Sequence, residues 1–324
     1  MSERLDHFMA RANAAYYATH DPFADFTTAP EISQVFGELL GLWAAVTWRS
    51  LGSPIPVLLV EMGPGRGTLM ADALRAIARA APAFRAAAAI HLIETSHRLR
   101  DVQRQRVPEA IWHDALDTVP NAPMILIGNE FLDALPIRQF VRRGAGWSER
   151  FVGPEGFLEL ATGNDPAVDI ADGAIIERRE AAEALVTTIA GRFARHIGAA
   201  LFLDYGPEAS APGDSLQAIT HGEPADPLVP AGTADLTAHV DFERLGVVAK
   251  AAGSGVHGPV PQGLFLARLG LFQRTNQLAR HLPPRAAAAM MEGARRLAEP
   301  DRMGRLFKAI ALLPPGAGTP PGFE

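Results

Sequence analysis

The chain has 324 residues, of which 48% are hydrophobic and 20% charged, so it can bury a substantial globular core. Its net charge of −6 argues against a general nucleic-acid-binding protein, which would present a basic surface. The absence of cysteine excludes disulfides, thiolate metal sites and a cysteine nucleophile.

The first 50 residues predict a helical segment. Thr28 and Glu31 form a capping-box pattern, and Pro30 suits the first helical turn. Six apolar residues then follow at helical spacing on one face: Ile32, Val35, Phe36, Leu39, Leu40 and Trp43. The start of the chain lacks the apolar core of a signal peptide, and no apolar run approaches the roughly 18 residues of a membrane span. We therefore expect a cytoplasmic protein that does not enter the membrane, and the Ala/Arg-rich composition is typical of a bacterium.

Short apolar runs alternate with helical stretches through the middle of the chain. Such runs suit strands that are buried on both faces of a parallel sheet, which predicts a doubly wound, Rossmann-like α/β fold. The core comprises residues 51–137 and 199–324, with an inserted hairpin and helix at residues 138–198 and a long Pro/Gly-rich loop at 206–232. The insertions follow the fourth and fifth strands. The clearest strands are Val57–Val60, Ile90–Ile93, Met124–Ile127 and Ala200–Leu203.

Acidic residues follow four of these strands, at the edge of the sheet where a doubly wound fold binds its ligand. They are Glu61, Glu94, Glu130 and Asp204. A cavity lined in this way predicts a ligand that carries positive charge.

The glycine-rich turn after the first of these strands matches neither common phosphate-binding motif. Gly63, Gly65 and Gly67 lie at relative positions one, three and five, whereas the dinucleotide motif requires one, three and six. The Lys-Ser/Thr pair of a P-loop is also missing. The turn resembles instead the first motif of class I S-adenosylmethionine methyltransferases, Glu/Asp-x-Gly-x-Gly-x-Gly. A tight strand–helix turn without a ligand is the structural alternative.

S-adenosylmethionine suits such a turn, because it has no phosphate but has an ammonium, a sulfonium and a ribose diol. Small residues let the backbone approach the ligand, and carboxylates compensate its charge. We assign Glu61 to the cationic end and Glu94 to the ribose hydroxyls. Asp114 is placed at the adenine amine, with an ordinary surface acid as an equal alternative. Asn129 is placed beside the cofactor, with helix capping as its alternative.

Several longer segments stand in a distinctive order along the chain: "DFTTAPEISQVFGELLGLW", "VEMGPGRGTLMADALR", "IETSHRLRDVQ", "GNEFLDALPIRQF", "LFLDYG", "GTADLTAHVDF" and "GPVPQGLFLARLG". In these segments and their order the chain is similar to the MidA-like family, which includes the mitochondrial arginine methyltransferase needed for assembly of respiratory complex I. The resemblance runs from about Tyr17 to Leu312. One departure is "HDPFADF", which is shorter than the loop usual in that family.

The resemblance implies a class I methyltransferase fold with S-adenosylmethionine bound at Gly63, Gly65, Gly67 and Glu94. It also implies a protein arginine as the methyl acceptor, on the complex I subunit equivalent to the mitochondrial 49-kDa chain. Neither nucleic acid nor a metal ion is expected to take part. Whether two chains pair as a homodimer stays open.

Three carboxylates after the fourth and fifth strands are candidates for the catalytic chemistry. Arginine has a pKa above about 12, so a base must take its proton as the new bond forms. Glu130 and Asp133 would share one face of a helical turn and hold the guanidinium, with helix capping as the alternative. Asp204 is expected to face the same cleft, with capping of the following turn as an equal alternative.

Several weaker candidates also have ordinary structural explanations. Thr27 and Thr28 are expected to border the cofactor, and Asp241 is expected to be a helix N-cap. Four further side chains are possible contacts of the acceptor, of which the histidines are more often structural: His221, Asp235, His239 and Gln262.

Two other functions compete with methyl transfer. An NAD(P)- or FAD-dependent oxidoreductase has the same order of strand, glycine turn and acid, but the glycine spacing and Pro64 disfavour it. A non-catalytic assembly factor is the second alternative, which the intact glycine turn disfavours without excluding. A hydrolase is disfavoured, because the chain has neither a Gly-x-Ser-x-Gly elbow nor a His-Glu-x-x-His helix.

Overall fold

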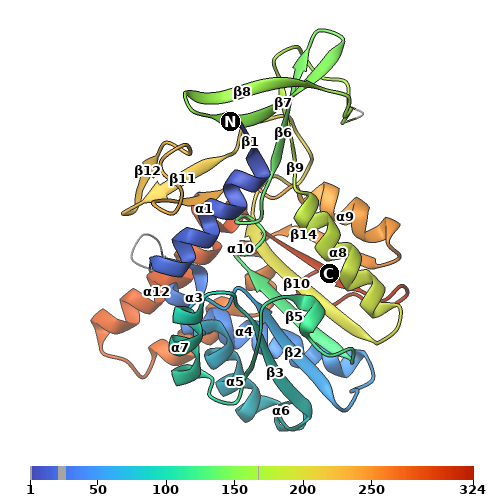
Figure 1. Cartoon of the computed structure of the whole chain (residues 1–324). Coiled ribbons are helices and arrows are strands. Elements are labelled where there is room, and N and C mark those ends of the chain that lie inside the picture. The colour runs from blue at the N-terminus through green and yellow to red at the C-terminus, as the bar shows by residue number, and fades with distance from the viewer. Residues whose placement is uncertain (1, 21–26, 167) are drawn as a thin grey trace.

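The computed structural model describes residues 2–20, 27–166 and 168–324. Its centre is a seven-stranded sheet in the order β14-β15-β10-β5-β2-β3-β4 (Figure 1). Five neighbouring strands are parallel, and β15 runs antiparallel to both β10 and β14. This confirms the predicted doubly wound, Rossmann-like sheet. The strands are β2 Val57–Met62, β3 Ala88–Ile93, β4 Ile111–His113, β5 Met124–Asn129, β10 Gly198–Tyr205, β14 Gly255–Pro261 and β15 Phe307–Leu313.

Helices cover both faces of this sheet, and the strand residues alternate between the two layers. On β2, Leu59 packs in the layer that contains α4 and α5, whereas Leu58 packs in the layer that contains α8 and α9. The chain therefore buries both faces, as continuous apolar strands require. The helices of the two layers are α4 Gln34–Ser50, α5 Thr68–Ala80, α6 Pro82–Ala87, α8 Glu180–Phe193, α9 Phe242–Ala251, α10 Gln262–Arg268, α11 Leu271–Ala279 and α12 Pro284–Ala298.

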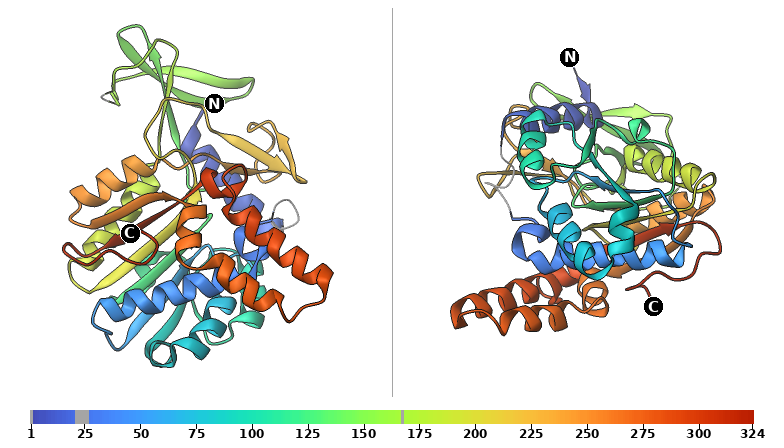
Figure 2. Two further views of the ribbon diagram at one scale, coloured as in Figure 1. Left: turned by 180° about the vertical axis from the view of Figure 1, so that it is seen from behind. Right: turned by 90° about the horizontal axis from the view of Figure 1, so that it is seen from below.

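The remaining elements lie around the ends and edges of the central sheet. Of the cover helices, α11 and α12 lie side by side and extend beyond the sheet (Figure 2). Near the end of the chain, the short helix α13 leads directly into β15. The other helices are α1 Leu5–Thr19, α3 Ala29–Ile32, α7 His97–Arg106, the short 3-10 helix η1 Leu116–Thr118 and α13 Met303–Leu306.

Two further sheets come from the segments expected as insertions. The predicted hairpin is confirmed by β6 and β7, and it forms a five-stranded sheet with β8, β9 and the N-terminal β1. Helix α8 was expected as part of the same insertion, but it packs on β10 in the core and is a cover helix of the central sheet. The strands of this sheet are β1 Glu3–Arg4, β6 Arg138–Arg143, β7 Gly146–Gly153, β8 Gly156–Thr162 and β9 Ile175–Arg178.

The Pro/Gly-rich segment at residues 206–232 was expected as a loop, and this prediction is wrong in part. Within it, β11 Gln217–Thr220 and β12 Glu223–Ala225 form a hairpin, and β13 Asp235–Thr237 pairs with β11 to complete a small sheet. His221 lies in the hairpin turn with a positive φ of 52° and is not among the residues that line the cavity described below. The pairing of β11 with β13 joins residues 16 to 20 positions apart, which local sequence patterns do not reveal.

The predicted capping box is also wrong. Thr28 is the N-cap of the short helix α3 but makes no side-chain cap hydrogen bond. Glu31 accepts a hydrogen bond from the Thr68 hydroxyl at 2.5 Å, so it joins α3 to α5. The long helix α4 begins separately, with Ser33 accepting from the backbone N–H of Val35. The shortened segment "HDPFADF" lies largely outside the described residues.

Candidate active site

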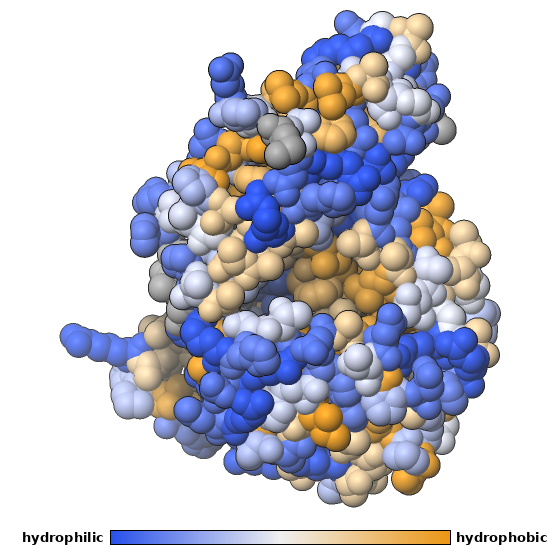
Figure 3. Space-filling model, in the orientation of Figure 1, coloured by the Kyte–Doolittle hydropathy of each residue, from blue (hydrophilic) through white to orange (hydrophobic). Residues whose placement is uncertain are grey.

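A cavity of about 820 Å³ lies beyond the carboxyl ends of the parallel strands. Its walls come from the ends of β2, β3, β5 and β10, from α1 and α3, and from the small sheet. Figure 3 shows this face of the molecule hollowed near its centre. The parallel strands thus bring acids that are distant in the sequence to one place, as the doubly wound fold predicts.

The glycine turn forms one wall of this cavity and requires glycine at each position. The φ angles of Gly63, Gly65 and Gly67 are 61°, 54° and 77°, in the left-handed region that side chains disfavour. A Cβ atom on Gly63 would lie 2.9 Å from the Phe131 ring. The turn therefore exposes bare backbone to the cavity.

Glu61 is a buried carboxylate at the base of the turn. It is 2% exposed, and its Oε2 atom has no hydrogen-bond partner among the described residues. Burial raises the pKa of this carboxyl to about 8, although a hydrogen bond from the Met70 backbone opposes the effect. An orphaned acid of this kind fits a ligand that carries positive charge, because such a ligand would favour the ionised carboxylate.

Glu94 lies at the end of the neighbouring strand and is held by two donors. Its Oε1 accepts from the backbone N–H of Ser96 at 2.8 Å, and its Oε2 accepts from the Gln103 side chain at 3.2 Å. Burial raises the pKa of this carboxyl, which these hydrogen bonds counteract. These hydrogen bonds fix the Glu94 carboxylate at the cavity wall, where it can accept hydrogen bonds from the hydroxyl groups of a ligand.

Gln103 was not recognised from the sequence. Its amide nitrogen also donates to the Gly65 carbonyl at 2.7 Å, and its oxygen accepts from the Trp112 indole at 2.8 Å. The side chain is fully buried and joins the glycine turn to Glu94. The sequence does contain an indication of this role, because Gln103 is a polar residue on the buried face of α7, four positions after Leu99.

Asp114 borders the cavity at its rim. Its side chain is 77% exposed and forms an ion pair with Arg100, which also donates to the Glu94 carbonyl. Its expected contact with an adenine amine stays a prediction. Thr27 and Thr28 also line the cavity, as expected for residues that border the cofactor.

Glu130 and Asn129 lie where β5 ends. Glu130 has a positive φ of 49°, and its Oε1 accepts from the backbone N–H of Ala29 at 2.9 Å and from the Asn129 amide at 3.0 Å. Burial raises the pKa of the Glu130 carboxyl to about 7. The Asn129 oxygen is buried without a partner among the described residues. Strain and unpaired polar atoms at one point are typical of a functional site.

Asp133 lines the same cavity as Glu130. The prediction that the two residues share one face of a helical turn is wrong. Residues 130–137 form bends and turns and contain no helical turn. Asp133 accepts a hydrogen bond from the backbone N–H of Ala134 at 2.9 Å. Burial raises the pKa of its carboxyl to about 6, although the charge of Arg179 opposes this effect.

Asp204 was expected to face the cleft, and the structure corrects this expectation. Its carboxylate is 0% exposed and is not among the residues that line the cavity. One oxygen accepts the backbone N–H groups of Phe131, Leu132 and Asp133, at 3.1, 2.7 and 3.2 Å. Asp204 therefore caps the turn that presents Asp133, so it is a positioning residue without contact to a ligand in the cavity.

Of three weaker candidates, Asp235 lines the cavity, whereas Asp241 and Gln262 do not. Asp235 lines the cavity from the small sheet. Asp241 is the N-cap of α9, as predicted, and accepts from the backbone N–H of Arg244. Gln262 lies away from the cavity, fully buried, and donates to the Leu297 carbonyl.

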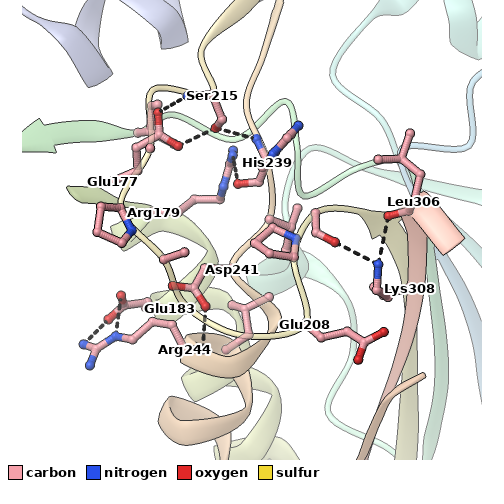
Figure 4. A pocket seen from close by; sticks show the side chains of 18 of the residues that line it. Glu177, Arg179, Glu183, Glu208, Ser215, His239, Asp241, Arg244, Leu306 and Lys308 are labelled. Atoms are coloured by element: carbon pink, nitrogen blue, oxygen red, sulfur yellow. Dashed lines mark hydrogen bonds and ion pairs between the residues drawn. The ribbon is translucent and has the colours of Figure 1, made fainter. Parts of the chain in front are cut away.

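A second cavity, of about 540 Å³, lies between α8, α9 and the segment after β10 (Figure 4). Several of its charged groups are paired with one another or with backbone: Arg244 with Glu183, and Arg179 with the Ala238 and His239 carbonyls. His239 borders this cavity and not the first one. The buried carboxylate oxygen without a partner among the described residues, Glu61 Oε2, belongs to a residue that lines the first cavity.

The strand order, the glycine turn and the acidic strand ends together define a class I S-adenosylmethionine-dependent methyltransferase. The orphaned Glu61 oxygen and the bare glycine backbone fit this cofactor. The residues that would hold it are Glu61, Gly63, Gly65, Glu94, Asp114 and Asn129, which all line the cavity, whereas Gly67 is the N-cap of α5 and is not among the lining residues. The structure shows no group of three or more His, Cys, Asp or Glu side chains placed to hold a metal ion within its described ranges.

Comparison with known proteins identifies the family. Residues 39–260 match the S-adenosyl-L-methionine-dependent methyltransferase family. The chain is 34% identical to the mitochondrial protein arginine methyltransferase NDUFAF7 homolog of Drosophila melanogaster, over 97% of this chain and 81% of that protein. It is 30% identical to the Homo sapiens protein, covering 97% and 80%. The chain therefore belongs to the MidA-like family of class I methyltransferases.

A solved structure supports the same conclusion. A Burkholderia thailandensis protein crystallised with S-adenosyl-homocysteine has a TM-score of 0.82 and 26% identity, covering 99% of this chain and 90% of that chain. The cofactor is S-adenosylmethionine, so the alternative of an NAD(P)- or FAD-dependent oxidoreductase is wrong. Among the helices within the described ranges, none is long and apolar enough for a membrane span.

Proposed function

We propose that this chain methylates an arginine side chain of a protein, on the complex I subunit equivalent to the mitochondrial 49-kDa chain, and thereby supports complex I assembly. The observation that carries the proposal is the pair of acids, the buried Asp133 and the partly buried Glu130, which line the same cavity as the glycine turn. The printed names of the relatives, as protein arginine methyltransferases, support the acceptor class. We place the reaction in the bacterial cytoplasm.

The two carboxyls suit a guanidinium acceptor. A cation beside them lowers their pKa values, so an arriving arginine favours their ionised forms. No described residue hydrogen-bonds to the Glu130 Oε2 atom, whereas Oε1 is held by Ala29 and Asn129. Glu130 can therefore stay fixed through one oxygen and offer the other to the acceptor.

Glu130 is our candidate for the proton acceptor. When bound, S-adenosylmethionine supplies a methyl group on a positively charged sulfur, which leaves as a neutral thioether. Asp133 orients the guanidinium, and Glu130 accepts the proton that the methylated nitrogen loses. A pKa of about 7 suits this role, because a base works best when its pKa lies near the operating pH.

The decisive variant is Glu130→Gln, which keeps the size of the side chain and removes the base. We expect S-adenosyl-homocysteine binding to stay within about threefold of the wild type, because the Glu130 carboxylate contacts the acceptor side. Methylation of the complex I subunit, measured by mass spectrometry, should fall by about 100-fold or more. The matched control is Glu223→Gln on the exposed strand β12. Undiminished turnover in Glu130→Gln would remove Glu130 from the mechanism.

The same assay separates catalysis from a purely structural assembly role. If the wild-type chain binds the cofactor, and complex I subunits from cells with and without it carry identical arginine methylation, the assembly-factor alternative replaces the enzyme proposed here.

A further inference from the structure

The small sheet of β11, β12 and β13 forms a second wall of the first cavity. One face of this sheet is apolar, and the other carries mostly polar side chains. Residues that face each other in β11 and β13 share one side of the sheet. Ala218 and Leu236 pack against α1 in a separate apolar core. The flanking positions point the other way and line the cavity: Gln217, Ile219, Asp235 and Thr237.

Two tyrosines connect this wall to the rest of the site. The Tyr17 hydroxyl on α1 donates to Asp235 Oδ1 at 2.8 Å. The Tyr205 hydroxyl at the end of β10 contacts Thr237 Oγ1 at 2.7 Å and accepts from the Gln217 amide at 2.9 Å. Burial raises the pKa of the Tyr17 hydroxyl, and the charges of Asp235 and Asp133 raise it further, so this phenol stays a donor.

Asn13 hydrogen-bonds to both segments that carry the two acids, Asp133 and Asp235. Its amide nitrogen donates to the Ala134 carbonyl at 3.0 Å and to the Leu236 carbonyl at 2.8 Å, and its oxygen accepts from the Leu236 N–H at 3.0 Å. These backbone groups are the immediate neighbours of Asp133 and Asp235. One side chain therefore joins the two segments that carry the acids.

Arg179 joins the same segments a second time. Its guanidinium donates to the carbonyls of Asp133 and Leu135 in one segment, and to those of Ala238 and His239 in the other. The side chain is 8% exposed. The two acidic segments are thus held rigidly side by side, as a preorganised binding site requires.

We propose that Asp235, oriented by Tyr17, is a second acceptor-binding carboxylate that holds the guanidinium together with Asp133 while Glu130 takes the proton. The inference rests on the proposed arginine acceptor and extends it to a residue supplied by the small sheet. The guanidinium fork has donors on two sides, which two fixed carboxylates can contact together. Asp235 binds the acceptor, so its loss raises KM more than it lowers kcat.

The test uses the full chain loaded with S-adenosyl-homocysteine, and two small probes: N-acetyl-arginine amide and its neutral analogue N-acetyl-citrulline amide. Binding is measured by NMR titration. We expect the wild type to bind the arginine probe and not the citrulline probe, and Asp235→Asn to weaken arginine binding by about tenfold or more. Asp235→Glu should recover part of the loss, and Tyr17→Phe should cause a smaller one. Glu223→Gln, on the exposed strand of the same sheet, is the matched control.

The outcomes distinguish this inference from the proposed function. If Asp235→Asn binds the arginine probe as the wild type does, or if the wild type binds neither probe, the second carboxylate site is overturned. Methylation of the complex I subunit by the wild type, with an unchanged acceptor KM in Asp235→Asn, overturns it while the proposed function stands. Arginine binding that depends on Asp235, without methylation of that subunit, upholds the site and removes the proposed function. Binding of S-adenosyl-homocysteine by each variant, measured by calorimetry, shows that the fold is intact.

Discussion

Replacing Glu61 by glutamine should remove a pH-dependent loss of stability from the cofactor-free protein. The Glu61 carboxyl is 2% exposed, and burial raises its pKa from 4.5 to about 8. Above pH 4.5 the unfolded chain releases this proton, whereas the folded chain keeps it until the pH approaches 8. Unfolding therefore becomes more favourable as the pH rises through this window, and the wild type loses stability that glutamine does not lose.

The magnitude follows from the two pKa values. Each pH unit between them changes the free energy of unfolding by about 1.4 kcal/mol. From pH 4.5 to pH 7 the wild type should lose roughly 3 kcal/mol relative to Glu61→Gln, and the difference should level off above about pH 8. This amount is a large fraction of the stability of an ordinary domain, which is about 5 to 15 kcal/mol.

Urea denaturation at several pH values between 4.5 and 8.5 measures this difference directly. The comparison uses the change with pH and not the absolute stability, because the glutamine amide also lacks a partner at the buried Oε2 position. Glu223→Gln, at an exposed site, is the control for removal of one carboxylate. Parallel curves for the wild type and Glu61→Gln would mean that Glu61 is already ionised in the folded protein, and the reasoning on its orphaned oxygen would be refuted. The same variant should bind S-adenosylmethionine more weakly by calorimetry, because the compensating charge is gone.

Three further results are expected. The kcat/KM for the protein acceptor should fall as the pH drops from about 7 to about 6, since protonated Glu130 and Asp133 neither hold a cation nor accept a proton; a flat pH–rate profile would contradict this. Gly63→Ala should lower the free energy of unfolding by about 1 to 2 kcal/mol in urea, because of its φ of 61° and the nearby phenyl ring, and unchanged stability would show that the turn relaxes. Gln103→Leu should weaken S-adenosyl-homocysteine binding by about tenfold in calorimetry, since the bond to the Gly65 carbonyl is lost, and equal affinity would assign Gln103 to folding alone.

The central sheet could be predicted from the sequence because its strands are buried on both faces and read as continuous apolar runs. The β2 strand is fully buried along its length and ends at the predicted acid and glycine turn. The strand-end acids Glu61, Glu94 and Glu130 reach one cavity because parallel strands end at one edge. These features depend on local sequence and on a general rule of the fold.

The features that the sequence did not reveal depend on partners far along the chain. The turn after Glu130 takes its shape from three backbone hydrogen bonds to Asp204, more than 70 residues later. Glu31 was assigned to a capping box but pairs with Thr68, 37 residues away. Asp235 becomes part of the cavity only because β13 pairs with β11. Local periodicity carries no information on such contacts.

The most direct test of the account is a crystal structure of the chain with S-adenosyl-homocysteine and an arginine-containing peptide from the complex I subunit. We expect the amino-acid part of S-adenosyl-homocysteine against the Gly63–Gly67 turn, its ribose hydroxyls on Glu94, and the peptide guanidinium within hydrogen-bond distance of Glu130 and Asp133. A peptide guanidinium bound away from these carboxylates, with the cofactor product in place, would contradict the arginine chemistry proposed for this site.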